Sequence, residues 1–449
     1  MEYRIERDTM GEMRVPSDAL YGPQTQRAVE NFPISRLRLP RIFLRALGLI
    51  KSSAAVVNGR LDELPADLAR SIARAADEVA EGKHDAHFVV DVFQTGSGTS
   101  TNMNANEVIG RLAKAHPNDQ VNRGQSSNDV IPAAIHIAAA LLVTEELLPA
   151  MRGLQQALAG KAKEFHDVIK IGRTHLQDAV PMRLGQEFSG YARQVELAIE
   201  RIDAALAGLY ELPLGGTAVG TGLNAVPGFA AQVIKDLGRR AALPFREAAN
   251  HFEAQGSKDA VCFLSAALRN YAVALTKIAN DIRWLGAGPR CGIGELTVPA
   301  TQPGSSIMPG KVNPVIVESV LMACAQVIGH DATIAWCCAA GNFELNVMMP
   351  VVAYDVLESI ELMVAVTRNF DEKCIRGLQA DRARAESFVE QSLAMCTALV
   401  PEIGYEKAAA IAKEAYGKGR TIREIAREKS GLSEERLREL LDPRRQAGA

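Results

Sequence analysis

The stretch SKDAVCFLSAALRNYAVALTKIANDIRWL, residues 257–285, contains neither glycine nor proline. Its apolar residues recur at intervals of three and four, from Val261 through Leu264 to Leu285, which is the spacing of one helix face. A helix over these roughly 29 residues would be ~44 Å long at 1.5 Å per residue. We therefore predict that the chain is built around long helices.

Neighbouring stretches extend this prediction along the chain. Helical spacing also covers residues 141–165 and 181–209, and proline is absent between Pro314 and Pro350 and again over 351–400. Several of these helices would be apolar on more than one face, so they must bury the extra faces against each other or against other subunits. Coiled-coil heptads are the alternative, but the apolar stripes are too broad and alanine-rich for a two-position seam. We predict a mainly α fold with a central bundle of long helices.

The length of the chain argues for several domains. Its 449 residues, 47% of them hydrophobic, are too many for one compact core. Residues 1–125 are mixed in pattern and predict short strands and helices, whereas 126–382 contain the long helices. Residues 383–449 are strongly charged and predict a small C-terminal helical domain, whose last residues, 443–449, we expect to fray.

Composition excludes several classes of partner. A net charge of -3 favours neither nucleic acid nor an anionic membrane. We expect no membrane span, because no uninterrupted apolar run reaches about 18 residues. The first residues, MEYRIERD, lack the apolar region of a signal peptide. The seven cysteines are an odd number without a CxxC pair, so we expect free thiols and a cytoplasmic location.

The loop GSSIMPGKVNP, residues 304–314, has the composition of an anion site. Asn313 is a good N-cap and Pro314 fits the first position of a following helix. A helix N-terminus offers unpaired N–H groups and partial positive charge, and Lys311 adds a full charge. We predict that this segment binds a carboxylate, with Ser305 on a loop that can fold over it. An ordinary turn before a helix is the alternative.

Two other segments place small polar residues before an expected helix. The first is TGSGTSTNMN, residues 95–104, and the second is QSSND, residues 125–129, which precedes a helix expected over 133–140. Their hydroxyl and N–H groups can bind carboxylate oxygens. Taken alone, the first segment is better explained as a Ser/Thr cap after a glycine turn, and the second is equally well explained as a capping motif.

A third segment, GRTHLQD at residues 172–178, places His175 in a polar turn that we expect to precede a helix. A solitary histidine is more often structural than catalytic. Glu318 changes this balance, because a Glu–His pair orients the imidazole and raises its basicity, so that His175 could activate a water. The glycine-rich run at 215–220 lacks the residues of a phosphate loop, and we find no metal-ligand set and no nucleophile elbow. Together these segments predict a small polycarboxylate substrate and no cofactor.

The same segments resemble the signature regions of the fumarase/aspartase superfamily, and the loop at 304–314 does so almost letter for letter. The resemblance extends from Arg14 to about Arg427 and is stronger to the class II, iron-free fumarases. It implies a three-domain, mainly helical homotetramer in which each active site combines regions from three subunits. It also implies that neither a metal nor an organic cofactor is needed.

The resemblance assigns roles residue by residue. Ser305 resembles the catalytic base, and His175 resembles a catalytic residue paired with Glu318. A secondary dicarboxylate site is implied at His116, Asn118 and Asp119. The implied substrate-binding residues are Ser97, Thr99, Asn102, Ser126, Ser127, Asn128, Thr174, Lys311 and Asn313.

The implied reaction is the reversible anti addition of water to fumarate, which gives L-malate through an aci-carboxylate. Aspartate ammonia-lyase is the alternative. His175 is fumarase-like, since aspartases have glutamine there, whereas Thr301-Gln302 and the NPVI run at 313–316 are more similar to aspartases. A helical assembly without catalytic activity is a third possibility, against which the complete residue set argues.

Overall fold

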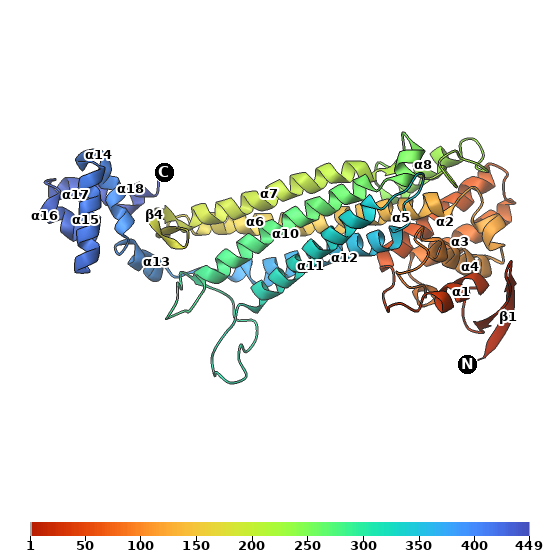
Figure 1. The fold of residues 1–449 in the computed structure, drawn as a ribbon, viewed down its shortest axis with the longest axis horizontal. Coiled ribbons are helices and arrows are strands. Elements are labelled where there is room, and N and C mark those ends of the chain that lie inside the picture. Colours follow the sequence, from red (N-terminus) through yellow and green to blue (C-terminus); the bar gives the residue numbers. More distant parts are fainter. Residues whose placement is uncertain (1, 449) are drawn as a thin grey trace. The chain divides into compact units, whose positions relative to one another are not determined.

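The computed structural model describes residues 2–448, which are mainly helical (Figure 1). The chain divides into two compact units. Unit 1 comprises the chain up to Pro149 together with Ile199–Ala272 and Cys324–Val364. Unit 2 comprises Ala150–Ala198, Val273–Ala323 and the chain from Ala365 onward. The predicted domain boundaries at 125 and 382 stay a prediction.

The long helices predicted from the spacing are present. Residues 257–285 form α10 (Asp259–Leu285), which has 27 residues. The helix α5 continues through a short π-helical turn, Val143–Leu147, into α6. The mainly α fold predicted from the sequence is confirmed. The other long helices are α5 (Ser127–Leu142), α6 (Leu148–Glu164), α7 (Leu184–Leu209), α11 (Val315–Ala339) and α12 (Met349–Lys373).

The apolar helices differ in how much of their surface the chain itself covers. Within residues 2–448, four helices are long and apolar enough to cross a membrane, by length and composition alone. The most apolar windows of α2 (Arg41–Arg60) and of the continuous helix 127–164 are 78% and 83% buried inside the protein. The corresponding windows of α10 and α11 are only 50% and 33% buried. These two helices therefore present apolar faces that this single chain leaves uncovered.

Unit 1 contains the mixed N-terminal region that the sequence predicts. The strands β1 (Tyr3–Asp8) and β2 (Gly11–Pro16) form an antiparallel ribbon, and the following helices share one apolar core. There α2 lies close to α3 (Ala66–Ala80), because a Cβ on Gly48 would be 2.5 Å from the backbone nitrogen of Ala80. The remaining elements of unit 1 are α1 (Pro23–Asn31), α3 (Ala66–Ala80), α4 (Thr99–Ala113), β5 (Glu211–Leu212), α8 (Phe229–Ala241), β6 (Arg246–Glu247) and α9 (His251–Gly256).

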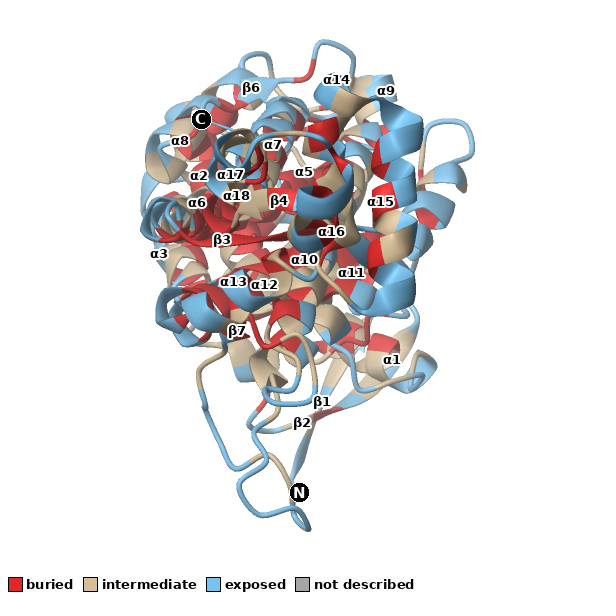
Figure 2. Ribbon diagram, turned by 90° about the vertical axis from the view of Figure 1, so that its left-hand side faces the viewer, coloured by how far each residue is buried: buried red, intermediate tan, exposed pale blue. Residues whose placement is uncertain are grey.

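Unit 2 is organised around a β-hairpin. The strand β3 (Ile169–Thr174) is buried over its first four residues (Figure 2) and pairs with β4 (Gln177–Arg183). Ile169 and Ile171 belong to the apolar core of the C-terminal helices. The other elements of this unit are β7 (Leu296–Thr297), β8 (Gln379–Ala380), α13 (Arg382–Val389), α14 (Val400–Ile403), α15 (Tyr405–Lys418), α16 (Ile422–Lys429), α17 (Glu434–Leu440) and α18 (Pro443–Gln446).

The expectation of a frayed C-terminus is wrong for the residues that the structure describes. Residues 443–446 form α18, and Ala447 is buried in the core of unit 2. The carbonyl of Ala447 also accepts a hydrogen bond of 2.8 Å from the Gln186 side chain. The burial of Ala447 and its hydrogen bond to Gln186 hold the segment in place. The polar composition of the segment does not reveal either contact.

Candidate active site

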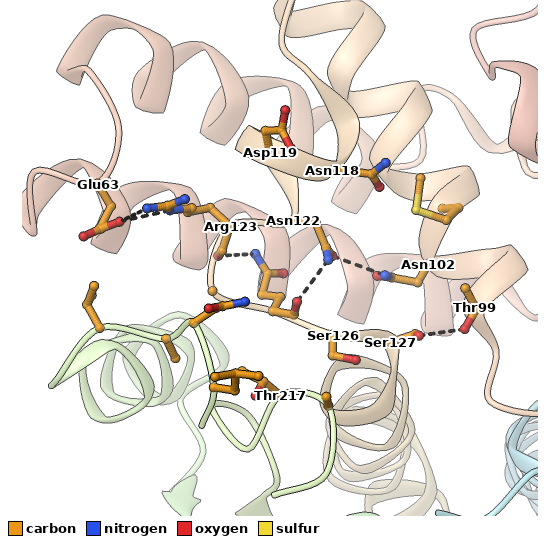
Figure 3. A pocket seen from close by; sticks show the side chains of 18 of the residues that line it. Glu63, Thr99, Asn102, Asn118, Asp119, Asn122, Arg123, Ser126, Ser127 and Thr217 are labelled. Atoms are coloured by element: carbon orange, nitrogen blue, oxygen red, sulfur yellow. Dashed lines mark hydrogen bonds and ion pairs between the residues drawn. The ribbon is translucent and has the colours of Figure 1, made fainter. Parts of the chain in front are cut away.

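Two of the predicted anion segments meet in unit 1. The helix α4 begins at Thr99, directly after Gly98, which takes a left-handed conformation with φ 73°. Ser97 and Thr99 share a hydrogen bond of 2.8 Å between their hydroxyls, and Thr99 shares another of 2.7 Å with the Ser127 hydroxyl. A continuous hydroxyl chain therefore joins the starts of α4 and α5 (Figure 3).

The helix α5 begins earlier than predicted. Its first residue is Ser127, and Pro132 lies inside the helix rather than ahead of it. Ser126 is the N-cap: its hydroxyl accepts from the Asn128 N–H at 3.2 Å, and its own N–H donates to Asp129 Oδ1 at 2.9 Å. This reciprocal cap pins the helix start, so that the serines lie at an N-terminus with its partial positive charge.

Most of the predicted residues of unit 1 line one cavity of about 850 Å³ (Figure 3). Ser97 is buried behind Thr99. Asn128 donates its side-chain amide to the Ala218 carbonyl at 2.7 Å. The predicted residues in the lining are Thr99, Asn102, Asn118, Asp119, Ser126 and Ser127, and they are joined there by Asn122, Arg123 and Thr217.

The glycine-rich segment at 215–222 forms one wall of this cavity. Asp129, which is fully buried, accepts hydrogen bonds of 3.0 Å from the N–H groups of Gly215 and Thr217. Burial raises the pKa of Asp129, although the N–H donors act in the opposite direction. Thr217 adopts a left-handed φ of 55°. The sequence analysis missed that Asp129 ties this segment to the start of α5.

The residues predicted to form a secondary site lie on a π-helical turn, Pro117–Val121, that His116 caps. The His116 Nδ1 accepts from the Asp119 N–H at 3.1 Å and lies 3.2 Å from the Asp119 carboxylate. Asn118 and Asp119 line the cavity described above. His116 instead lines a second cavity of about 530 Å³, near Glu107.

In unit 2, Thr174 and His175 occupy the end of the β3–β4 hairpin. The expectation that this segment precedes a helix start is wrong, since β4 intervenes before α7. His175 and Leu176 form a two-residue turn with φ values of 57° and 58°. Glycine and asparagine are the usual residues in such a turn. The strained turn projects His175 into solvent, where its side chain is exposed in this single chain.

The loop at 304–313 closes on itself through its two ends. The Gly304 N–H donates to the Lys311 carbonyl at 3.0 Å, and the Asn313 side chain donates to the Gly304 carbonyl at 2.5 Å. The Ser305 hydroxyl accepts from the N–H groups of Ile307 and Met308 at 3.2 and 2.9 Å. The Ser305 oxygen thus faces two backbone donors, an arrangement that would stabilise negative charge on it.

The prediction that Asn313 caps the following helix is wrong in detail. The helix α11 begins at Val315, one residue later than predicted, and the Asn313 side chain is used to close the loop. Lys311 is exposed two residues before Asn313. Within residues 2–448 of this single chain, no hydrogen bond or ion pair joins His175 to Glu318, and both side chains are exposed.

Comparison with known proteins identifies the family. The family model described as Lyase matches residues 11–329, and the one described as Fumarase C C-terminus matches residues 395–445. A class II fumarate hydratase of Mycobacterium tuberculosis is 54% identical over 97% of this chain and 93% of its own length. The chain belongs to the class II fumarase family.

Other class II fumarases agree with this assignment. One from Ralstonia nicotianae is 51% identical over 95% of both chains. The crystal structure of a class II fumarase from Schistosoma mansoni covers 100% of this chain and 99% of its own, with a TM-score of 0.98 and 39% identity. The predicted similarity to fumarases rather than aspartases is confirmed, despite the aspartase-like residues at 301–302 and 313–316.

Proposed function

We propose that this member of the class II fumarase family is a fumarate hydratase, which interconverts fumarate and L-malate. One observation carries the proposal: the N-termini of α4 and α5 meet at one cavity lined by hydroxyl and amide side chains. Two helix N-termini with such a lining suit a small dianion, because N–H groups and hydroxyls are donors to carboxylate oxygens.

The chemical step is assigned to the loop at 304–313. Removing the proton from the carbon next to a carboxylate creates a doubly charged aci-carboxylate, which requires positive charge already in place. Lys311, with Asn313 and the N-terminus of α11, supplies that charge. Ser305 is the proposed base, and the N–H groups of Ile307 and Met308 lower the energy of its alkoxide.

The hydroxyl side of the reaction is assigned to His175. Paired with Glu318, its imidazole would exchange a proton with the attacking or departing water. Thr174 lies beside it at the end of the hairpin. Because the pair does not form within one chain, we assign its two members to different subunits.

A homotetramer would bring these regions together. Phe263 on α10 is 55% exposed, and Met322 and Trp336 on α11 are 69% and 76% exposed. Apolar side chains gathered on long helices favour burial against further copies of the same helices. We therefore propose that three subunits contribute to each active site. No cofactor is required by this mechanism, and the free thiols fit a cytoplasmic location.

The first test uses the ultraviolet absorbance of fumarate. The purified protein should produce it from L-malate without added metal, and a chelator should not change the rate. We expect Ser305→Ala and His175→Asn to lose most of the turnover, by about a hundredfold or more, because each removes a proton-transfer group. Circular dichroism should show an unchanged helical content, and near-normal rates in both variants would contradict the mechanism.

The aspartase-like residues at 301–302 and 313–316 call for a side-by-side assay with aspartate. A fumarate hydratase should act on L-malate and release no ammonium from aspartate. Release of ammonium with no activity on malate would assign the chain to the ammonia-lyases instead.

A further inference from the structure

A buried lysine lies beneath the cavity and has no role in the mechanism described so far. Lys51 is in the middle of α2 and its exposed fraction is 0%. Its ammonium donates one hydrogen bond of 2.9 Å, to the side-chain oxygen of Asn122. In the part of the chain that the structure describes, residues 2–448, no carboxylate forms an ion pair with it.

Asn122 connects this ammonium to the cavity wall. The same side-chain oxygen also accepts from the amides of Asn102 and Asn106, each at 3.2 Å. The Asn122 amide nitrogen donates to the Gln125 carbonyl at 3.1 Å, which orders the turn that leads to Ser126. Asn102 and Asn122 both line the cavity (Figure 3). Three donors on one oxygen leave Asn122 little freedom to rotate.

The charge of Lys51 is incompletely balanced by its surroundings. Burial lowers the pKa of Lys51 to about 7, and attraction to Asp129 opposes this effect. The Asp129 carboxylate is itself used by the N–H groups of Ser126, Gly215 and Thr217. A buried ammonium with so little compensation is unfavourable unless an anion joins it.

The acidic side chains on the other elements packed against α2 have partners other than Lys51. Asp236 of α8 pairs with Arg239 and accepts from the Ser53 hydroxyl. Glu107 of α4 accepts from the N–H groups at the start of α1. Asp77 of α3 pairs with Arg240. An anion in the cavity is therefore the available partner for the charge of Lys51.

We propose that Lys51 is a positioning residue for the dicarboxylate: its ammonium orients Asn122 and Asn102, and its buried charge attracts the dianion. This inference deepens the proposed function and rests on it. Lys51 on α2 would thus be a second positive charge for the substrate, in addition to Lys311 of the proposed mechanism.

The proposal predicts that substrate binding and protonation of Lys51 are coupled. A dianion favours the charged amine, so affinity is greatest below pH 7 and falls as the pH rises through the pKa of Lys51. The KM for L-malate should therefore rise above neutral pH, by up to about tenfold per pH unit if the coupling is complete.

The test compares Lys51→Met with the parent protein and with Lys161→Met, in which another buried lysine is replaced. Between pH 6 and 9 the parent and Lys161→Met should show a KM that rises several-fold. For Lys51→Met we expect a KM about tenfold higher at pH 6 with no rise across this range. The kcat should change less than the KM, because Lys51 does not touch the reacting atoms.

An unchanged KM and pH profile in Lys51→Met would overturn the proposal. If the parent protein turned over neither malate nor fumarate, the proposed function would fail instead. A second measurement does not depend on any variant: calorimetric binding of succinate to the parent protein at pH 8, in two buffers of different ionisation enthalpy. We expect uptake of a substantial fraction of a proton, and binding without uptake would contradict the coupling.

Discussion

At the scale of single residues, this protein places charged and strained groups where local preferences disfavour them. His175 and Leu176 adopt left-handed backbone conformations that glycine usually occupies. Lys51 is buried in the middle of an apolar helix. Such positions persist only when the surrounding structure imposes them, and they concentrate at functional sites.

The buried lysine has a consequence for stability that can be measured without substrate. Its pKa falls from 10.5 to about 7 on folding, so between these pH values the unfolded chain binds more protons, and the free energy of unfolding rises with pH. Replacing Lys51 by methionine removes this penalty, which is roughly 5 kcal/mol at most at about 1.4 kcal/mol per pKa unit.

We therefore expect Lys51→Met to raise the melting temperature at pH 6, and the gain to shrink toward pH 10. Thermal unfolding followed by circular dichroism at several pH values measures this difference. Lys161→Met, whose lysine donates to Glu164 and to the Leu378 carbonyl, is the control and should lose stability at every pH. A gain from Lys51→Met that grew with pH would show that the assignment of the charge is wrong.

At the scale of elements, the two ends of the loop at 304–313 meet at Gly304, Lys311 and Asn313, and we call this meeting point the neck of the loop. The neck depends on close approach of backbone atoms. A Cβ on Gly304 would lie 2.3 Å from the Lys311 carbonyl oxygen and 2.7 Å from the Asn313 nitrogen. Backbone atoms cannot yield as a flexible side chain can, so any larger residue must open the neck. Opening it would displace Ser305 and Lys311 from each other.

We expect Gly304→Ala to lower turnover at least tenfold, because a small misplacement of catalytic groups is costly to the rate. Stability should change by less than about 1 kcal/mol, since the loop is largely exposed and outside the apolar cores. Gly417→Ala on α15 is the matched control, because nothing lies within 4 Å of its added Cβ. Steady-state rates measure the turnover of both variants, and melting curves measure their stability. Full activity of Gly304→Ala would contradict the role of the neck.

At the scale of the whole molecule, the uncovered apolar faces of α10 and α11 point to assembly. We expect Trp336→Glu to disrupt the oligomer and to reduce activity with it, because it buries a charge where another subunit should pack. Tyr416→Glu on α15 is the control, since Tyr416 is 78% exposed, close to the 76% of Trp336. Sedimentation velocity measures the oligomeric state, and an unchanged assembly in Trp336→Glu would contradict this interface.

Much of the helical architecture could be predicted because helix periodicity and capping depend on residues within a few positions of each other. Residues 257–285 predicted α10 to within two residues. The sequence also predicted that the hydroxyl-rich segments 95–104 and 125–129 lie at helix starts, and α4 and α5 begin within them. The hairpin that carries His175 was missed, because its strand β3 is defined by packing against C-terminal helices far along the chain.

The resemblance named candidate site residues but not the hydrogen-bond network around them. Asn122, Asp129 and Thr217 lie within or beside quoted motifs, yet their contacts join segments up to 88 positions apart. A lysine inside an apolar helical stretch was the available signal for Lys51. Its partner could not be inferred, because Asn122 is 71 positions away.

The amino-acid sequence by itself determined the long helices, the family and the positions of the polar segments predicted to bind anions, since periodicity and short motifs are local properties. Only the tertiary structure decided which of those segments share a cavity and that a buried ammonium lies beneath it. Contacts between distant positions carry no local pattern, and burial is a property of the folded whole.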